Sequence, residues 1–208
     1  MGLAITERAA LADLFDRLGP DAPTLCEGWL TRDLAAHLVI RERRPDAGVG
    51  IVVPAFAGRT ASVQASTAKR PFADLVKAVR TGPPMWNPMG LGPLNEALNA
   101  LEFLVHHEDV RRAESDWEPR PLPAAAVEQA WERLLAFAKL GFRKSTVGVV
   151  LRRPDGQAAT VKTGSSTVTL TGDPVELVML AYGRHEYRVR IDGDPDDVAN
   201  FQASLAGP

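Results

Sequence analysis

The chain has 208 residues, of which 45% are hydrophobic and 24% charged, and a formal net charge of -2 at pH 7. This composition is typical of a globular protein and excludes a disordered, collagen-like or disulfide-stabilised chain. The 24 basic and 26 acidic residues nearly balance, so neither nucleic acid nor a membrane is an expected partner. The N-terminal residues lack the basic start and apolar stretch of a secretory signal, which predicts a cytoplasmic protein.

Helical periodicity dominates the first two thirds of the chain. The apolar spacing predicts helices over about residues 5–18, 31–44, 71–81, 94–112 and 124–142. Residues 45–69 show no clean period and are interpreted as a long connection that contains some helix. The four main helices among these predict a four-helix bundle.

The sequence pattern changes near residue 145. The β-branched runs VGVVLRR, AATVKT and STVTLTG, separated by PDG and GSS turns, predict an antiparallel meander. A short helix beginning at Asp173-Pro174, a strand at YRVRI and a last helix in DPDDVANFQASL follow. The predicted fold is therefore α+β, with a helical bundle over residues 1–143 and a small α+β domain over residues 144–208.

The predicted helix at 94–112 carries polar residues on the face that should be buried. Its apolar stripe is accompanied by Glu102, His106 and Asp109. Burying a carboxylate without a cation is costly, so a metal ion or arginine partners should accompany these side chains.

Two histidines and one glutamate are predicted to form a metal site. Glu102 and His106 are four residues apart and lie on neighbouring turns of one helix face, while His37 lies between two leucines on the apolar side of the 31–44 helix. Two imidazole nitrogens and one carboxylate oxygen are typical of catalytic zinc, with a fourth position left for water or substrate. The alternative is a scaffold in which Glu102 only pairs with a histidine or an arginine.

Other candidates take lesser roles. Asp109 could orient the ring of His106, with an ion pair to an arginine such as Arg112 or Arg41 as the alternative. His107 points away from His106 on the helix and is predicted to be solvated. The single cysteine, Cys26, has no resolving partner and is predicted to be inert.

Two stretches, LCEGWLTRDLAAHL and LEFLVHHEDVRRA, resemble the metal-binding N-terminal domain of the mycothiol-dependent maleylpyruvate isomerase family, within the DinB-like superfamily. In that family one histidine follows the tryptophan, and a later helix carries Glu and His four apart, which correspond to His37, Glu102 and His106. Gly183-Arg184 and Gly193-Asp194 resemble the signature of its C-terminal domain, which is related in shape to sterol carrier proteins.

This resemblance implies a divalent metal, expected to be zinc, and mycothiol or a similar low-molecular-weight thiol as cosubstrate. Such a metal would lower the thiol pKa. Arg184 would hold a substrate carboxylate, with an ion pair to Asp192 or Asp194 as the alternative. Family isomerases commonly have VHGWDL where this chain has VHHEDV, so His107 and Glu108 are expected to alter the surface beside the site and the substrate.

The resulting functional hypothesis is a thiol-dependent isomerase or thiol S-transferase that acts on a small electrophile or unsaturated keto acid. The alternative is a non-catalytic metal-binding module whose C-terminal domain binds a partner or an apolar ligand. The expected partners are the small-molecule substrate and the thiol. A monomer is the default expectation, with a homodimer as the alternative.

Overall fold

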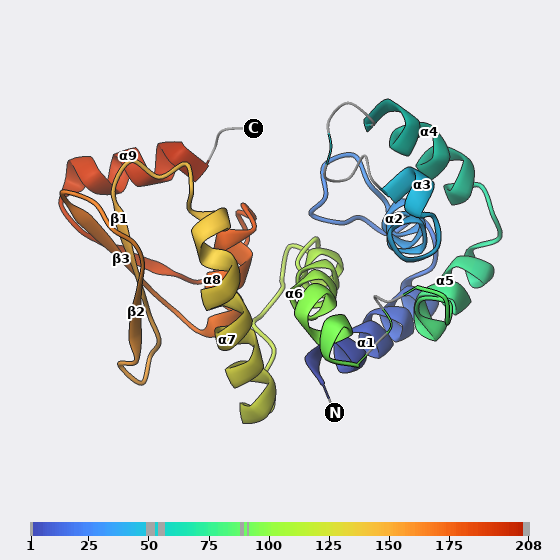
Figure 1. The fold of residues 1–208 in the computed structure, drawn as a ribbon, viewed down its shortest axis with the longest axis horizontal. Coiled ribbons are helices and arrows are strands. Elements are labelled where there is room, and N and C mark those ends of the chain that lie inside the picture. Colours follow the sequence, from blue (N-terminus) through green and yellow to red (C-terminus); the bar gives the residue numbers. More distant parts are fainter. Residues whose placement is uncertain (1, 49–52, 54–56, 88–89, 91, 206–208) are drawn as a thin grey trace. The chain divides into compact units, whose positions relative to one another are not determined.

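The computed structural model describes residues 2–48, 53, 57–87, 90 and 92–205, and the chain divides into two compact units, residues 1–119 and 120–208 (Figure 1). The described part of the N-terminal unit is helical. Its helices are α1 (Leu3–Leu18), α2 (Thr31–Arg43), α3 (Pro45–Gly48), α4 (Ala57–Ala68), α5 (Phe72–Thr81) and α6 (Gly92–Arg111). The four helices predicted before residue 119 are confirmed, and the connection at 45–69 contains α3 and α4, although residues 49–52 and 54–56 of it lie outside the described residues.

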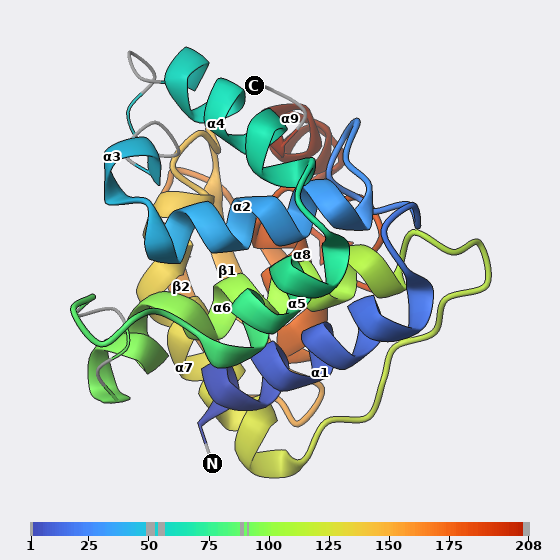
Figure 2. The ribbon, with the colours of Figure 1, turned by 90° about the vertical axis from the view of Figure 1, so that its right-hand side faces the viewer.

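Helices α1, α2, α5 and α6 share one apolar core. Each contributes side chains spaced three or four residues apart, as a helix that buries one face requires. The core includes Leu11 and Phe15 of α1, Leu34 and Leu38 of α2, Leu75 and Val79 of α5, and Phe103 and Val110 of α6. Figure 2 shows α1, α2, α5 and α6 together in the N-terminal unit. Throughout the described part of the chain, every helix is too short or too polar to cross a bilayer.

An ion pair between α1 and α2 is buried beside this apolar core. The Arg8 guanidinium of α1 binds the carboxylate of Glu42 on α2, and their side chains are 8% and 2% exposed. Arg8 also donates to the carbonyl of Val79 and stacks on the ring of Phe103, 4.1 Å from its centroid. These contacts join α1, α2, α5 and α6 through one side chain.

We expect Glu42→Gln to lower the free energy of unfolding by about 3 kcal/mol, because Arg8 would then be a buried charge without its counter-ion. Urea denaturation followed by circular dichroism measures this loss. The double variant Arg8→Met/Glu42→Met should regain part of it, since neither charge remains. A Glu42→Gln protein as stable as the wild type would contradict the assignment.

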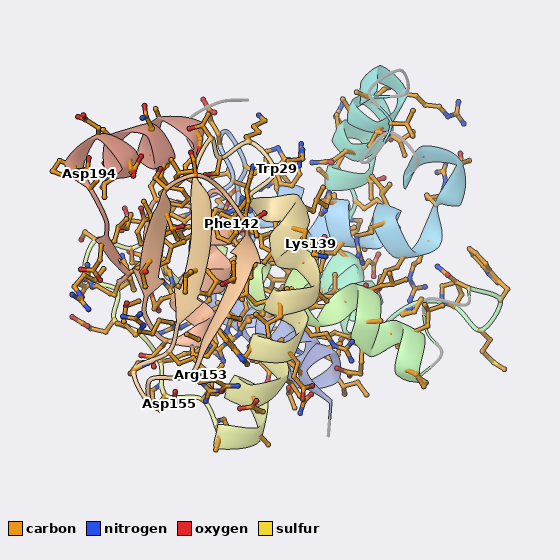
Figure 3. The ribbon with its side chains drawn as sticks, turned by 60° about the vertical axis from the view of Figure 1, so that its left-hand side comes forward. Trp29, Lys139, Phe142, Arg153, Asp155 and Asp194 are labelled. Carbon is orange, nitrogen blue, oxygen red and sulfur yellow. The ribbon has the colours of Figure 1, made fainter. Side chains whose placement is uncertain are left out.

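The C-terminal unit contains a four-stranded sheet and three helices among its described residues. Its elements are α7 (Ala124–Gly141), β1 (Gly148–Arg152), β2 (Ala158–Lys162), β3 (Thr167–Thr171), α8 (Pro174–Ala181), β4 (Arg190–Asp192) and α9 (Pro195–Leu205). Helix α7, expected within the bundle domain, packs against α8 and β2. Figure 3 shows Phe142 at the end of α7, where its ring lies 6.0 Å from that of Phe201 on α9.

The predicted antiparallel meander is wrong in its strand order. The order is β2-β1-β3-β4, with β1 antiparallel to β2 but parallel to β3. The short β2–β3 connection must therefore cross the start of β1, and there Gly148 and Gly164 approach so closely that a Cβ on Gly164 would collide with the backbone of Gly148. The strand pairing depends on this close glycine contact, which a pattern of turns does not reveal.

Candidate metal centre

The three predicted metal-ligating residues come together between α2 and α6. Nε2 of His37 lies 3.4 Å from Oε1 of Glu102, and Nε2 of His106 lies 3.3 Å from the same oxygen. The two imidazole rings meet edge to face, with centroids 5.3 Å apart. One ligand atom from each residue lies within 4.8 Å of the other two, which is close enough for a single cation to contact all three.

Helix geometry explains why these atoms converge. Glu102 and His106 lie one turn apart on α6, while His37 lies on the buried face of α2 among core leucines. Both histidine side chains are 10% exposed and that of Glu102 is 20% exposed. The donor atoms are thus held by packing, and the site keeps limited access to solvent.

An arginine also contacts the carboxylate. Nε of Arg41 lies 3.2 Å from Oε1 of Glu102. The rest of its guanidinium is held independently, because it donates to the carbonyl of Leu98 at 2.9 Å and to the side-chain oxygen of Asn99. The alternative raised by the sequence, in which Glu102 pairs with an arginine, is therefore also present: Arg41 contacts the carboxylate that the two histidines contact.

Burial and hydrogen bonding shift the pKa values of the cluster. Burial lowers the pKa of His37, which favours its neutral form. Burial alone would raise the pKa of Glu102, but hydrogen bonds from His106 and His37 outweigh it and hold that pKa well below its usual range. Burial would likewise lower the pKa of His106, yet Asp109, Cys26 and Glu102 together raise it well above its usual range. The cluster therefore stabilises an anionic Glu102 and a positive charge beside it.

Asp109 lies against the far edge of His106. Its Oδ2 accepts a hydrogen bond from Nδ1 of His106 at 2.9 Å, and its side chain is fully buried. A carboxylate that binds Nδ1–H orients the ring so that Nε2 points at Glu102, where Nε2 can ligate a metal once it has lost its proton. The orienting role of Asp109 stays a prediction, and this contact is the one through which Asp109 would act.

Cys26, which the sequence predicts to be inert, lies in contact with this cluster. Its Sγ donates to Oδ2 of Asp109 at 3.2 Å and lies 3.9 Å from Nδ1 of His106. The contact arises because the loop before α2 is hydrogen-bonded to α6, with the amide of Leu25 donating to the carbonyl of Asp109 at 2.9 Å. The position of Cys26 three residues before Trp29, in the stretch that also contains His37, was the available signal.

The prediction that His107 is solvated is wrong. His107 is 6% exposed, and its Nδ1 lies 2.8 Å from Oε2 of Glu7 on α1. Glu108 is fully buried, where it binds Nε of Arg112 at 2.7 Å and the guanidinium of Arg111. Both residues are therefore buried, with partners on α1 and on nearby arginines, and neither forms an exposed surface beside the site.

We expect Glu7→Gln to lower the free energy of unfolding by about 1–3 kcal/mol, because it weakens a buried, charge-assisted hydrogen bond to His107. The metal content of the purified protein should not change, since His107 lies on a different side of α6 from Glu102. Urea denaturation and elemental analysis of the same sample measure the two quantities. A fall in metal content without a loss of stability would place His107 in the site after all.

Arg184 lies in the C-terminal unit, directly after Gly183, whose φ of 72° lies in the left-handed region. Its guanidinium donates to the carbonyl of Tyr182 at 3.1 Å. Of the two proposed ion-pair partners, Asp192 pairs with Arg190 at 2.7 Å and Asp194 accepts the amide of Asp196 at 3.0 Å.

Comparison with known proteins bears on the fold. No protein-family model and no curated protein matches the chain. The crystal structure of the mycothiol-dependent maleylpyruvate isomerase does match, with a TM-score of 0.56 and 16% identity over 91% of this chain and 89% of that one. This chain shares the fold of that enzyme. A histidine-to-alanine mutant of the enzyme gives a TM-score of 0.58 and 14% identity over 91% and 90% of the two chains. The resemblance seen in the motifs is thereby confirmed at the level of fold.

Proposed function

We propose that the protein is a metal-dependent enzyme that uses a small thiol, either as an isomerase or as a thiol S-transferase. The observation that carries this proposal is the convergence of His37, Glu102 and His106, with Asp109 behind the His106 ring. The shared fold with a mycothiol-dependent isomerase supports mycothiol or a similar thiol as the cosubstrate.

The donor set fits a divalent cation, and zinc is the cation we propose. Two imidazole nitrogens and one carboxylate oxygen suit zinc and leave a coordination position for an exogenous ligand. The low pKa of Glu102 provides the anion, and Asp109 presents Nε2 of His106 to the site. Arg41 contacts the same Oε1 of Glu102 as the two histidines and balances the charge of that carboxylate.

A divalent cation bound by these residues would lower the pKa of a thiol and so supply a thiolate nucleophile at neutral pH. His37, Glu102 and His106 hold the site in place, and Asp109 keeps the ring of His106 in one orientation. The buried surroundings of both imidazoles limit the access of water.

The substrate class follows from thiolate chemistry. Addition of a thiolate to an activated double bond forms a carbon–sulfur bond and leaves a carbon–carbon single bond that can rotate. Elimination then breaks the carbon–sulfur bond, restores the double bond and regenerates the thiol, which gives isomerisation. Without elimination the product is a conjugate. We propose a small unsaturated keto acid or another small electrophile as substrate, with Arg184 binding its carboxylate.

The proposal also covers the C-terminal unit, the cellular location and the oligomeric state. The C-terminal unit is proposed to resemble sterol carrier proteins and to contribute Arg184 to substrate binding. The protein is proposed to work in the cytoplasm on small molecules, as a monomer.

The wild-type protein, purified under zinc-replete conditions, should contain at least about one divalent ion per chain. His37→Ala should lower the metal content by about one ion per chain, because the two remaining ligands of this centre bind a cation far more weakly. Elemental analysis measures the content, and circular dichroism checks that the variant folds. Wild-type protein without stoichiometric metal would refute the proposed centre, while metal without measurable thiol affinity would favour the non-catalytic module.

Glu102→Gln separates the metal centre from the arginine alternative. If Glu102 ligates a metal, this variant should lose metal as His37→Ala does, since a neutral amide is a poor ligand for zinc. If Glu102 only pairs with Arg41, the free energy of unfolding should change while the metal content stays constant. Elemental analysis and urea denaturation of the same preparation distinguish the two results.

Asp109→Asn should weaken zinc binding by about 10- to 100-fold, because the carboxylate that orients His106 is replaced by an amide. Competition with a chelator of known affinity measures the change. Asp13→Asn, which alters an exposed carboxylate of α1 paired with Arg80, is a matched control and should leave zinc affinity unchanged. Equal affinity in Asp109→Asn and wild type would show that Asp109 does not act through His106.

A further inference from the structure

The ring of His106 belongs to two groups of potential ligands. Its Nε2 faces Glu102, whereas its Nδ1 faces Asp109 and Cys26. In this second group the sulfur lies 3.2 Å from Oδ2 of Asp109 and 3.9 Å from Nδ1 of His106, and these two atoms are 2.9 Å apart. These separations are close to those between neighbouring ligands around a tetrahedral cation.

The loop that carries Cys26 is held in place by several hydrogen bonds. The amide of Cys26 donates to Oγ1 of Thr24 at 3.2 Å, that hydroxyl donates to the carbonyl of Trp29, and the amide of Trp29 donates to the carbonyl of Cys26. Pro23 and Leu30 form an antiparallel bridge across the base of the loop. With the bond from Leu25 to Asp109, these contacts fix the sulfur over α6 before any ligand arrives.

The chemistry of the three groups differs from that of the first cluster. Asp109 is fully buried, His106 as a whole residue is 8% exposed and Cys26 is half-buried, so Cys26 is the most accessible of the three residues. A thiolate is a soft ligand, and its combination with imidazole and carboxylate favours zinc or cadmium over magnesium or calcium. His37 and Glu102 offer no sulfur, so the two groups select cations differently.

We propose that Cys26, His106 and Asp109 form a second cation site, which binds a thiophilic divalent metal. Binding releases the thiol proton of Cys26 and the Nδ1 proton of His106 to solvent, and both atoms then ligate the cation beside Asp109. A cation there removes the hydrogen bond through which Asp109 orients His106. The proposal does not depend on the enzymatic function proposed above.

Cadmium titration of the full chain tests this site, because cadmium bound to a thiolate absorbs in the ultraviolet. The His37→Ala variant serves as the background, since it disables the first cluster and keeps all three residues of the second. We expect this variant to show a thiolate-to-cadmium band that saturates at roughly one cadmium per chain. Adding Cys26→Ser should abolish the band, and adding Asp109→Asn should weaken cadmium binding by about tenfold or more.

Two results would overturn the proposal. One is the absence of a thiolate band in the folded His37→Ala protein. The other is an unchanged cadmium affinity on adding Asp109→Asn, which would show that Cys26 binds the ion without the buried carboxylate.

Cadmium NMR of the protein with His37 intact supplies a second measurement if the His37→Ala protein does not fold. A resonance in the range of sulfur-containing sites, absent from Cys26→Ser, supports the second site. Only a nitrogen- and oxygen-type resonance, seen in both proteins, refutes it. Because the first cluster contains no sulfur, sulfur-type signals report only the second site and nitrogen- and oxygen-type signals report only the first. The failure of one site can therefore be told apart from the failure of the other.

Discussion

The N-terminal unit depends on how α6 satisfies the polar side chains that it buries. Among the last ten residues of this helix, His106, His107, Glu108 and Asp109 are at most 8% exposed, and Glu102 lies one turn before them. Each buried charge must be matched by a partner, or the folded state becomes unstable. The partners come from α1, α2, the loop before α2 and nearby arginines. The packing that stabilises the bundle therefore also positions the proposed ligands.

This arrangement gives the two sides of α6 different roles. On one side, Glu7 of α1 binds His107 and the contact is structural. On the other, His37 and Arg41 of α2 face Glu102, whose side chain keeps 20% exposure. Neighbouring residues of one helix therefore have different roles: His107 makes a structural contact, whereas Glu102 and His106 are proposed ligands. They point to different sides because successive residues are rotated by about 100° around the helix axis.

The sequence predicted features that depend on local periodicity. The four-residue spacing of Glu102 and His106 and the inward position of His37 were accessible in this way. Spacing gives the angle of a side chain around a helix but not what packs there, so the burial of His107 against α1 could not be predicted. Strand pairing also escaped prediction, because turns delimit strands without stating their neighbours, and the passage of the chain past Gly148 depends on tertiary contact.

The imidazole of His106 on α6 faces residues from two segments, the loop before α2 and the helix α2 itself. One edge of the His106 ring faces Cys26 and the other faces Glu102 and, across it, His37. A proton or cation bound at one edge changes the electron density and orientation offered at the other. By thermodynamic linkage, a cation in the proposed site at one edge and a cation in the proposed site at the other would change each other's affinity by the same factor.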